Sequence, residues 1–223
     1  MCSGRVDPEF VIRAFKKGID GVFIGACHLN ECNYITHGNF HTLNMVLLYR
    51  RILEHVGINP DRLWIRFMSG AEANVFVESV NEFVKNVKSL GPIGKAEGMD
   101  NDTLMAKLDE IKKLIPYIKV AKREKLATRL ESHDQYDQYF TKDEIEALFR
   151  DVPAYYIDPT KCQACMTCAR RCPVEAIISA KGQVHIVDQD KCIKCGTCIE
   201  VCPPRFAAVT KIVGAPVPPP LPE

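Results

Sequence analysis

The chain has 223 residues, of which 47% are hydrophobic and 26% are charged, a composition typical of an ordinary globular protein. Its 29 basic and 28 acidic residues leave a net charge of +1, which gives no electrostatic support for nucleic acid as a partner. No run of 18 apolar residues occurs and no secretory signal opens the chain, so direct membrane insertion is not predicted.

The first helix is predicted between Asp7 and Gly18. Asp7 is a suitable cap, Pro8 suits the first helical position, and Gly18 suits the end. Residues three and four positions apart lie on the same side of a helix. We expect its buried face to carry Phe10, Val11, Ala14 and Phe15.

Short apolar strands and amphipathic helices then alternate. Strands are predicted over 21–27 and 62–68, and helices over 40–56 and 71–91. This alternation favours an α/β fold with a parallel sheet. A doubly wound sheet normally has a strand where Cys2 stands, so we expect the first strand to be missing.

A helical linker is predicted next. The stretch from about 103 to 133 has a helical pattern, and Pro116 within it predicts a kink or a break. Thr141, followed three positions later by Glu144, predicts a capping box at the start of another short helix.

Two cysteine motifs stand near the end of the chain. "KCQACMTCARRCP" (161–173) and "KCIKCGTCIEVCP" (191–203) both have the spacing C-x2-C-x2-C-x3-C-P. Thiolates are soft ligands that suit iron–sulfur centres, and Ala164 and Gly196 are small residues in loops where backbone amides can turn toward cluster sulfurs. Beyond the repeat, the tail "GAPVPPPLPE" is predicted to be extended.

In two-cluster ferredoxins the fourth cysteine of each motif serves the other cluster. Applied to this repeat, the rule predicts two crossed ligand sets. The first [4Fe-4S] cluster takes Cys162, Cys165, Cys168 and Cys202, and the second takes Cys192, Cys195, Cys198 and Cys172. A pair of zinc sites is the alternative, but zinc does not call for the third cysteine or for the Cys-Pro pairs. The stretch resembles a bacterial-type ferredoxin, which implies one-electron transfer.

Three further cysteines, Cys2, Cys27 and Cys32, lie near the start of the chain. The carboxyl ends of parallel strands share one edge of a sheet, so Cys2 and Cys27 are expected to meet there, with Cys32 close by in sequence. A [2Fe-2S] cluster needs four ligands. The fourth could be His28, His37 or His41, or could lie upstream; alternatively Cys27 is a core residue and Cys2 a free thiol.

The stretch "CSGRVDPEF" and the continuation through "GINPDRLWIRFMSGAEANVFVESVNEFV" closely resemble the delta subunit of methyl-viologen-reducing, F420-non-reducing hydrogenases. The resemblance implies a flavodoxin-like fold and one [2Fe-2S] cluster, with Cys2, Cys27 and Cys32 as candidate ligands. It also implies electron transfer from a hydrogenase or formate dehydrogenase-like partner to the flavin-containing subunit of a heterodisulfide reductase-like complex. Family members have more residues ahead of "CSGR", so the N-terminus is truncated relative to the family.

Four segments are therefore predicted. They are a delta-subunit-like α/β domain (1–92), a helical linker (93–155), an α+β ferredoxin-like domain with two [4Fe-4S] clusters (156–212) and a Pro-rich tail (213–223).

We expect an electron-transfer subunit that is not catalytic alone, in the cytoplasm of an anaerobic organism. No nucleotide-binding fingerprint and no paired-carboxylate site occurs. Two alternatives use the early thiols. One is a thiol or disulfide reductase acting through Cys27 or Cys32, and the other is a redox sensor.

Overall fold

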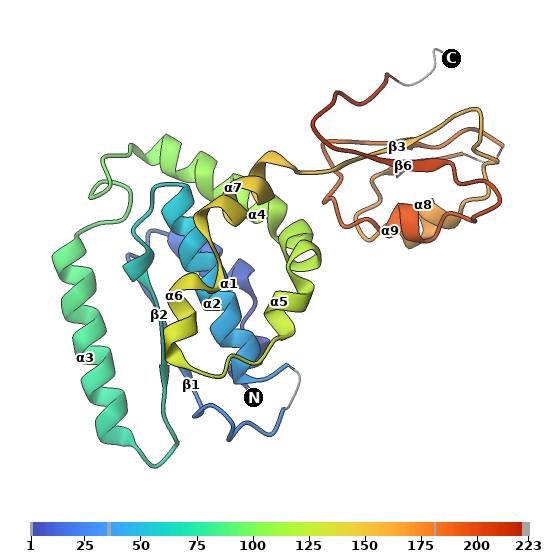
Figure 1. Cartoon of the computed structure of the whole chain (residues 1–223). Coiled ribbons are helices and arrows are strands. Elements are labelled where there is room, and N and C mark those ends of the chain that lie inside the picture. The colour runs from blue at the N-terminus through green and yellow to red at the C-terminus, as the bar shows by residue number, and fades with distance from the viewer. Residues whose placement is uncertain (1, 35–36, 181, 220–223) are drawn as a thin grey trace. The chain divides into compact units, whose positions relative to one another are not determined.

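The computed structural model describes residues 2–34, 37–180 and 182–219. Two compact units can be distinguished, and each is described by itself (Figure 1). The N-terminal unit comprises Met1–Ile115 and Ala121–Glu146, and the C-terminal unit comprises Pro116–Val120 and Ala147–Glu223.

The N-terminal unit is a mixture of helices and two strands. Its elements, two of which continue into the other unit, are η1 (Ser3–Arg5), α1 (Pro8–Lys16), β1 (Val22–Ala26), α2 (Asn39–His55), η2 (Pro60–Arg62), β2 (Leu63–Phe67), α3 (Ala73–Leu90), α4 (Asn101–Ala121), α5 (Arg123–Ala127), η3 (His133–Gln135), α6 (Tyr136–Tyr139) and α7 (Lys142–Arg150). β1 and β2 pair in parallel, with Val22 opposite Leu63 and Ala26 opposite Phe67. The parallel pairing predicted from the sequence is confirmed.

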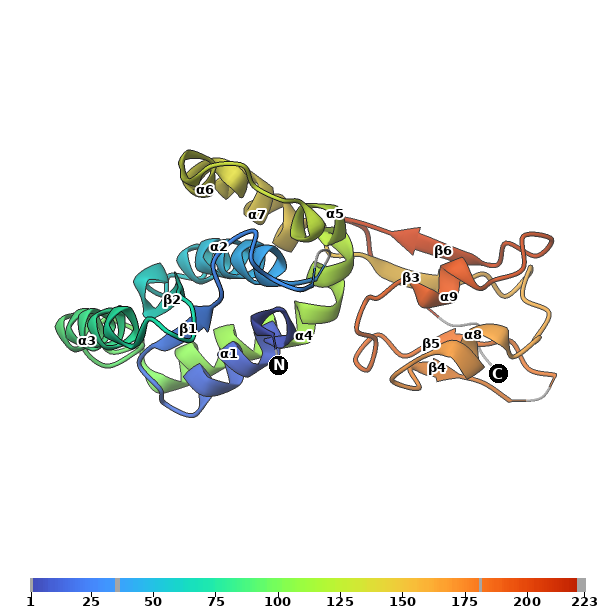
Figure 2. The same cartoon turned by 90° about the horizontal axis from the view of Figure 1, so that it is seen from below.

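Helices cover both faces of this strand pair. Figures 1 and 2 show α3 on one side of β1 and β2, with α1 and α2 on the other. Phe23 and Trp64 are register partners, and both rings contact Phe83 of α3, with centroids 5.6 and 5.4 Å away. Because side chains alternate along a strand, Ile24 and Leu63 point to the opposite side, where they are buried.

The helix α1 begins as predicted but buries a different face. The Asp7 carboxylate accepts a hydrogen bond from the Glu9 backbone N–H (2.9 Å), and Pro8 follows the cap. Phe10, expected inside, is 59% exposed, whereas Ile12 is fully buried. The buried residues of α1 recur at the spacing of a helix and are Pro8, Val11, Ile12 and Phe15.

The break that the sequence allowed at Pro116 does not occur. The helix α4 does not end at Pro116 but continues to Ala121. Its stripe of buried residues, which includes Leu108 and Ile111, packs well enough to offset a proline cost of about 3 kcal/mol.

The expected capping box is only half formed. The Thr141 hydroxyl accepts a hydrogen bond from the Glu144 backbone N–H (3.2 Å). The Glu144 carboxylate, however, pairs with Lys122 (2.5 Å) and Lys125 (2.7 Å). Two lysine charges are stronger partners for it than the single N–H of a helix cap.

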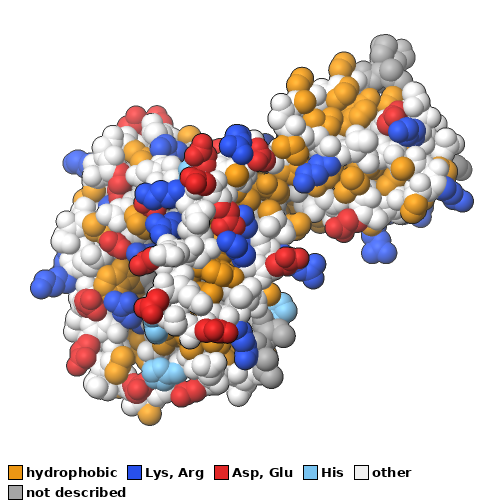
Figure 3. Space-filling model, viewed as in Figure 1, with side chains coloured by type: hydrophobic (Ala, Val, Ile, Leu, Met, Phe, Trp, Pro, Cys, Tyr) orange, Lys and Arg blue, Asp and Glu red, His pale blue; other side chains and the backbone are white. Residues whose placement is uncertain are grey.

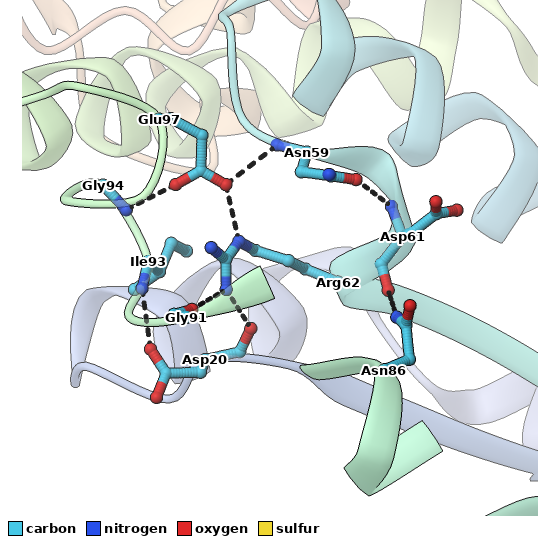
Figure 4. Close-up of polar contacts among 9 residues, drawn as sticks. All are labelled: Asp20, Asn59, Asp61, Arg62, Asn86, Gly91, Ile93, Gly94 and Glu97. Atoms are coloured by element: carbon cyan, nitrogen blue, oxygen red, sulfur yellow. Dashed lines mark hydrogen bonds and ion pairs between the residues drawn. The ribbon is translucent and has the colours of Figure 1, made fainter. Parts of the chain in front are cut away.

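A buried arginine closes the amino-terminal end of the strand pair. The Arg62 guanidinium is fully buried and pairs with Glu97, whose Oε1 lies 2.7 Å from Nε (Figure 4). Its Nη1 donates to the backbone carbonyls of Asp20 and Gly91, each at 2.9 Å. Glu97 also accepts from the N–H of Gly94 (2.8 Å), so the segment after α3 is fastened to the sheet.

The C-terminal unit is built from two similar halves. Its elements are β3 (Ala154–Ile157), α8 (Thr167–Arg171), β4 (Ile177–Ile178), β5 (Ile186–Val187), α9 (Thr197–Glu200) and β6 (Val209–Ile212). β3 pairs antiparallel with β6, and β4 pairs antiparallel with β5. The strand that enters each half therefore pairs with the strand that leaves the other half, and the two halves fold as one body.

Candidate functional site

Each predicted quartet of late cysteines surrounds its own cavity in the C-terminal unit. Cys162, Cys165, Cys168 and Cys202 line the first cavity, with about 300 Å³ of space not filled by protein atoms. Cys172, Cys192, Cys195 and Cys198 line the second, with about 330 Å³. Each fourth cysteine reaches the cavity of the other half, which is the crossing that the sequence predicted.

The loops that carry these cysteines turn their backbone in the same way. Ala164 and Met166 in the first loop, and Lys194 and Gly196 in the second, all have a positive φ, between 49° and 83°. Such left-handed residues turn successive backbone N–H groups toward one side, an arrangement common around iron–sulfur sites. Only one of the four positions is glycine, so three side chains tolerate a conformation that costs L-residues energy.

Polar neighbours and burial set different environments for the thiols. The Thr167 hydroxyl lies 3.4 Å from Cys165 Sγ, and this hydrogen bond is the main cause that holds the pKa of Cys165 below its ordinary value. Burial raises the pKa of Cys168 to about 11 and that of Cys198 to about 12. A metal ion that bound these buried thiols would displace their protons.

The sequence analysis missed His185. This residue is 1% exposed and lines the first cavity. Its Nδ1 lies 3.4 Å from Cys168 Sγ, and its Nε2 lies 3.3 Å from Met166 Sδ. Burial lowers the pKa of His185. The sequence did contain a signal for this residue. The two halves of the repeat align with an offset of thirty residues, and at the position equivalent to Tyr155 the second half has a histidine in an apolar stretch.

The three early cysteines come together at the carboxyl-terminal edge of the strand pair. Cys27 directly follows β1, Cys2 precedes η1, and Cys32 lies in the loop before α2. The Sγ atoms of Cys2 and Cys32 are 3.5 Å apart. Cys27 forms a side-chain hydrogen bond with Cys32, and the negative charge of a Cys2 thiolate would also raise the pKa of Cys27. Cys27 also lies on the wall of a cavity between the end of β1 and the start of α3.

A buried asparagine and two glycines shape this loop. The Asn39 amide is 1% exposed and donates to the carbonyls of Cys27 (2.9 Å) and His28 (2.7 Å). A Cβ added at Gly38 would lie 2.5 Å from Cys32 Sγ, and one at Gly4 would lie 2.0 Å from the His37 carbonyl oxygen. A side chain at either position would therefore clash, at residue 4 with the backbone of the loop and at residue 38 with the Tyr34 carbonyl oxygen and the Cys32 sulfur.

The pKa values of Cys27 and Cys32 are shifted in opposite directions. Burial, followed by the neighbouring Cys32, raises the pKa of Cys27. Burial alone would also raise the pKa of Cys32, but hydrogen bonds from the backbone N–H groups of Tyr34 and Asn39 hold it below its ordinary value.

The histidines considered as a fourth ligand are placed as follows. The Nε2 of His28 lies 2.7 Å from the Glu72 carboxylate. The rings of His37 and His41 are tilted by 43° to each other, with centroids 5.9 Å apart. Among the described residues, no group of three or more His, Cys, Asp or Glu side chains could hold a single metal ion.

The two units differ in their surfaces. Figure 3 shows basic and acidic side chains interspersed over the N-terminal unit, whereas hydrophobic side chains gather on the viewed face of the C-terminal unit. An apolar cavity in the C-terminal unit is lined by β3, by residues 183–187 and by Val217–Pro219 of the tail. In the described part of the chain, no helix is long and apolar enough to cross a membrane.

Comparisons with known proteins separate two regions of the chain. Residues 1–91 match the family model for the delta subunit of methyl-viologen-reducing hydrogenase. Residues 154–203 match the model for a 4Fe-4S dicluster domain. The iron–sulfur subunit of an F420-non-reducing hydrogenase from Methanopyrus kandleri is 40% identical over 92 residues, which cover 41% of this chain and 69% of that relative. The chain belongs to the methyl-viologen-reducing hydrogenase delta-subunit family.

Other relatives extend this family assignment. The corresponding iron–sulfur subunit from Methanococcus maripaludis is 44% identical over 91 residues, 41% of this chain and 67% of that relative. A ferredoxin/F420H2-dependent CoB-CoM heterodisulfide reductase subunit from Methanosarcina acetivorans is 44% identical over 94 residues, 42% of this chain. The chain spans only 12% of the length of this last relative. The predicted delta-subunit family and the predicted 4Fe-4S region are both confirmed.

Proposed function

We propose that this protein is an iron–sulfur electron-transfer subunit. The observation that carries the proposal is the pair of cavities in the C-terminal unit, each lined by one crossed quartet of cysteines. The eight thiols are ligands of two [4Fe-4S] clusters in the crossed sets predicted above. When bound, such clusters accept and release single electrons.

The chain's own residues prepare these two sites. The loops share left-handed residues at equivalent positions, and hydroxyls lie near equivalent cysteines, Thr167 near Cys165 and Thr197 near Cys195. Ile157 lines the first cavity and Ile177 the second, and these apolar side chains limit the access of water. The result is an environment suited to reversible electron exchange rather than to substrate chemistry.

For the N-terminal unit we propose a flavodoxin-like fold, with β1 and β2 as part of its parallel sheet. Cys2, Cys27 and Cys32 supply three of the four thiolates that a [2Fe-2S] cluster takes. The support is their convergence, with 3.5 Å between the Sγ atoms of Cys2 and Cys32.

The partners follow from the relatives. We propose that electrons pass between a hydrogenase or formate dehydrogenase-like partner and a flavin-containing heterodisulfide reductase-like partner. Relatives carry the names of F420-non-reducing hydrogenase and CoB-CoM heterodisulfide reductase subunits. A reducing cytoplasm is the proposed location, supported by eleven cysteines that are all free of disulfides.

One observation favours a second candidate function, a thiol–disulfide reductase. The Sγ atoms of Cys2 and Cys32 are close, and the pKa of Cys32 is held low, which are properties of a reactive thiol pair. In this alternative the C-terminal unit supplies the electrons, and Cys27 or Cys32 attacks the disulfide substrate.

Anaerobic reconstitution of the full chain tests the main proposal. We expect about eight irons from the two [4Fe-4S] clusters and uptake of about two electrons from a titrated reductant. Cys202→Ser should remove about half of this iron, and should do so from the cluster otherwise bound by the first motif. Cys32→Ser is the matched control that leaves both [4Fe-4S] clusters intact.

A colourless, iron-free chain would contradict the proposal. Retention of both clusters in Cys202→Ser would contradict the crossed ligand sets. Disulfide reduction that is present in the unsubstituted chain and lost in Cys32→Ser, with the iron of both [4Fe-4S] clusters retained, would favour the alternative.

A further inference from the structure

The two halves of the C-terminal unit carry different side chains at several equivalent positions, including the pair formed by Tyr155 and His185. Cys162 and Cys192 stand thirty positions apart, as do Cys168 and Cys198. The same offset makes Tyr155 the equivalent of His185. Tyr155 lines the second cavity, and His185 lines the first.

The two side chains make different contacts. The His185 Nδ1 lies 3.4 Å from Cys168 Sγ. Tyr155 faces the second quartet, but its hydroxyl makes no hydrogen bond to Cys198 within the described part of the chain. The hydroxyl lies instead 2.9 Å from where a Cβ on Gly196 would stand. Glycine at this position therefore leaves room for the tyrosine ring, and the equivalent residue in the first half is Met166.

Donor chemistry decides the direction of the His185 contact. A thiolate ligand only accepts hydrogen bonds, and the Met166 thioether is a weak acceptor. The ring nitrogen that faces Cys168 is therefore the one that carries a proton. Since His185 is 1% exposed, water does not compete for this bond.

We propose that His185 is a positioning residue that makes the two clusters unequal. Its ring N–H donates to Cys168 Sγ and gives the first cluster a higher reduction potential than the second. This inference rests on the proposed function, because it requires Cys168 to be a cluster ligand.

The physical reason is the added negative charge of the reduced state. Hydrogen bonds to ligand sulfurs are among the factors that set cluster potentials. A donor stabilises the sulfur more when the cluster is reduced, because the thiolates then carry more negative charge. Thr167 and Thr197 occupy equivalent places beside Cys165 and Cys195, so their effects largely cancel between the two halves. The His185 hydrogen bond has no such counterpart in the second half. When one electron is added to the protein, it therefore reduces the first cluster in preference to the second.

The test is an anaerobic redox titration of the reconstituted full chain, followed by electron paramagnetic resonance. Cys165→Ser alters the signal of the first cluster and so assigns the two signals. In His185→Tyr, which places at this position the side chain present in the other half, the first cluster should become harder to reduce. We expect about a tenfold fall in the ratio of reduced first to reduced second cluster, equivalent to 59 mV for one-electron couples.

Two matched variants separate the hydrogen bond from packing. His185→Gln retains an N–H donor and should recover part of the ratio. Tyr155→Phe removes a hydroxyl that makes no hydrogen bond to a cysteine sulfur within the described residues, and should leave the ratio unchanged. An unchanged ratio in His185→Tyr with full iron content would overturn the inference while leaving the proposed function intact.

A second measurement does not depend on any variant. With nitrogen-isotope-labelled histidine in the unsubstituted chain, pulsed resonance should detect nitrogen coupling to the reduced first cluster. Absence of that coupling would also overturn the inference. Failure of the unsubstituted chain to bind iron would instead overturn the proposed function on which the inference depends.

Discussion

The two units of this protein are held together by different means. The N-terminal unit has an extended core in which α2 alone contributes eleven buried residues, and it fastens its connecting segments with buried polar groups such as Arg62 and Asn44. The C-terminal unit has strands of only two to four residues, and its buried cluster of nine residues includes two cysteines. One unit is stabilised by conventional burial, whereas the small buried cluster of the other includes cysteines that we propose as cluster ligands.

The largest expected effect is on removal of iron. Metal binding contributes to the folding free energy when the ligand side chains would otherwise surround an empty cavity. Chelation of the full chain should abolish hydrogen-exchange protection across residues 154–212 and leave the protection of α2 unchanged, as an internal control. If the C-terminal unit keeps its protection without iron, the comparison between the units is wrong.

The next effect concerns the buried ion pair of the N-terminal unit. Glu97→Gln leaves the buried Arg62 charge uncompensated and should cost about 3–5 kcal/mol of unfolding free energy. Urea unfolding followed by the fluorescence of Trp64, the sole tryptophan, measures it. Glu9→Gln is the control, because its pair with Lys112 is long (3.6 Å) and exposed, worth about 0–1 kcal/mol. Equal losses in the two variants would refute a special role for the buried pair.

A smaller effect is expected at Asn44. This fully buried amide donates to the carbonyls of Lys125 (3.0 Å), Leu126 (3.2 Å) and Thr128 (2.7 Å), and so ties the end of α5 to α2. Asn44→Ala leaves these carbonyls without that donor and should cost about 1–3 kcal/mol in the same urea experiment. Asn86→Ala removes one exposed bond to the Asp61 carbonyl and should cost less. The reverse order would contradict the interpretation.

The smallest effect is a pH dependence confined to the N-terminal unit. Burial on its own would raise the pKa of Glu97, but the hydrogen bond and charge of Arg62 hold it below its ordinary value. The stabilisation is present above the unfolded pKa of about 4.3 and is lost as the pH falls through the lower folded value. Acid titration of the urea midpoint should show this loss in the unsubstituted chain and not in Glu97→Gln. An identical slope in both would show that other carboxylates cause it.

The grouping of the late cysteines around two cavities could be predicted from the sequence because ligand spacing is local. A C-x2-C-x2-C loop must present its thiols to one centre, and the fourth cysteine follows a known crossing rule. The contact among Cys2, Cys27 and Cys32 was harder to predict, because Cys2 and Cys32 are separated by thirty residues. Their approach depends on the parallel strands and on the close packing at Gly4 and Gly38. Asn39, which fixes that loop, carries no signal in the sequence beyond its place at the start of a helix.

The sequence by itself determined the helix and strand pattern, the delta-subunit family and the cysteine repeat, because these depend on periodicity and short-range spacing. Only the tertiary structure decided that α1 exposes Phe10 and that Glu144 pairs with two lysines. It also decided that the ring of His185 lies beside Cys168. Those outcomes depend on which side chains distant segments bring into contact, and local patterns do not specify such contacts.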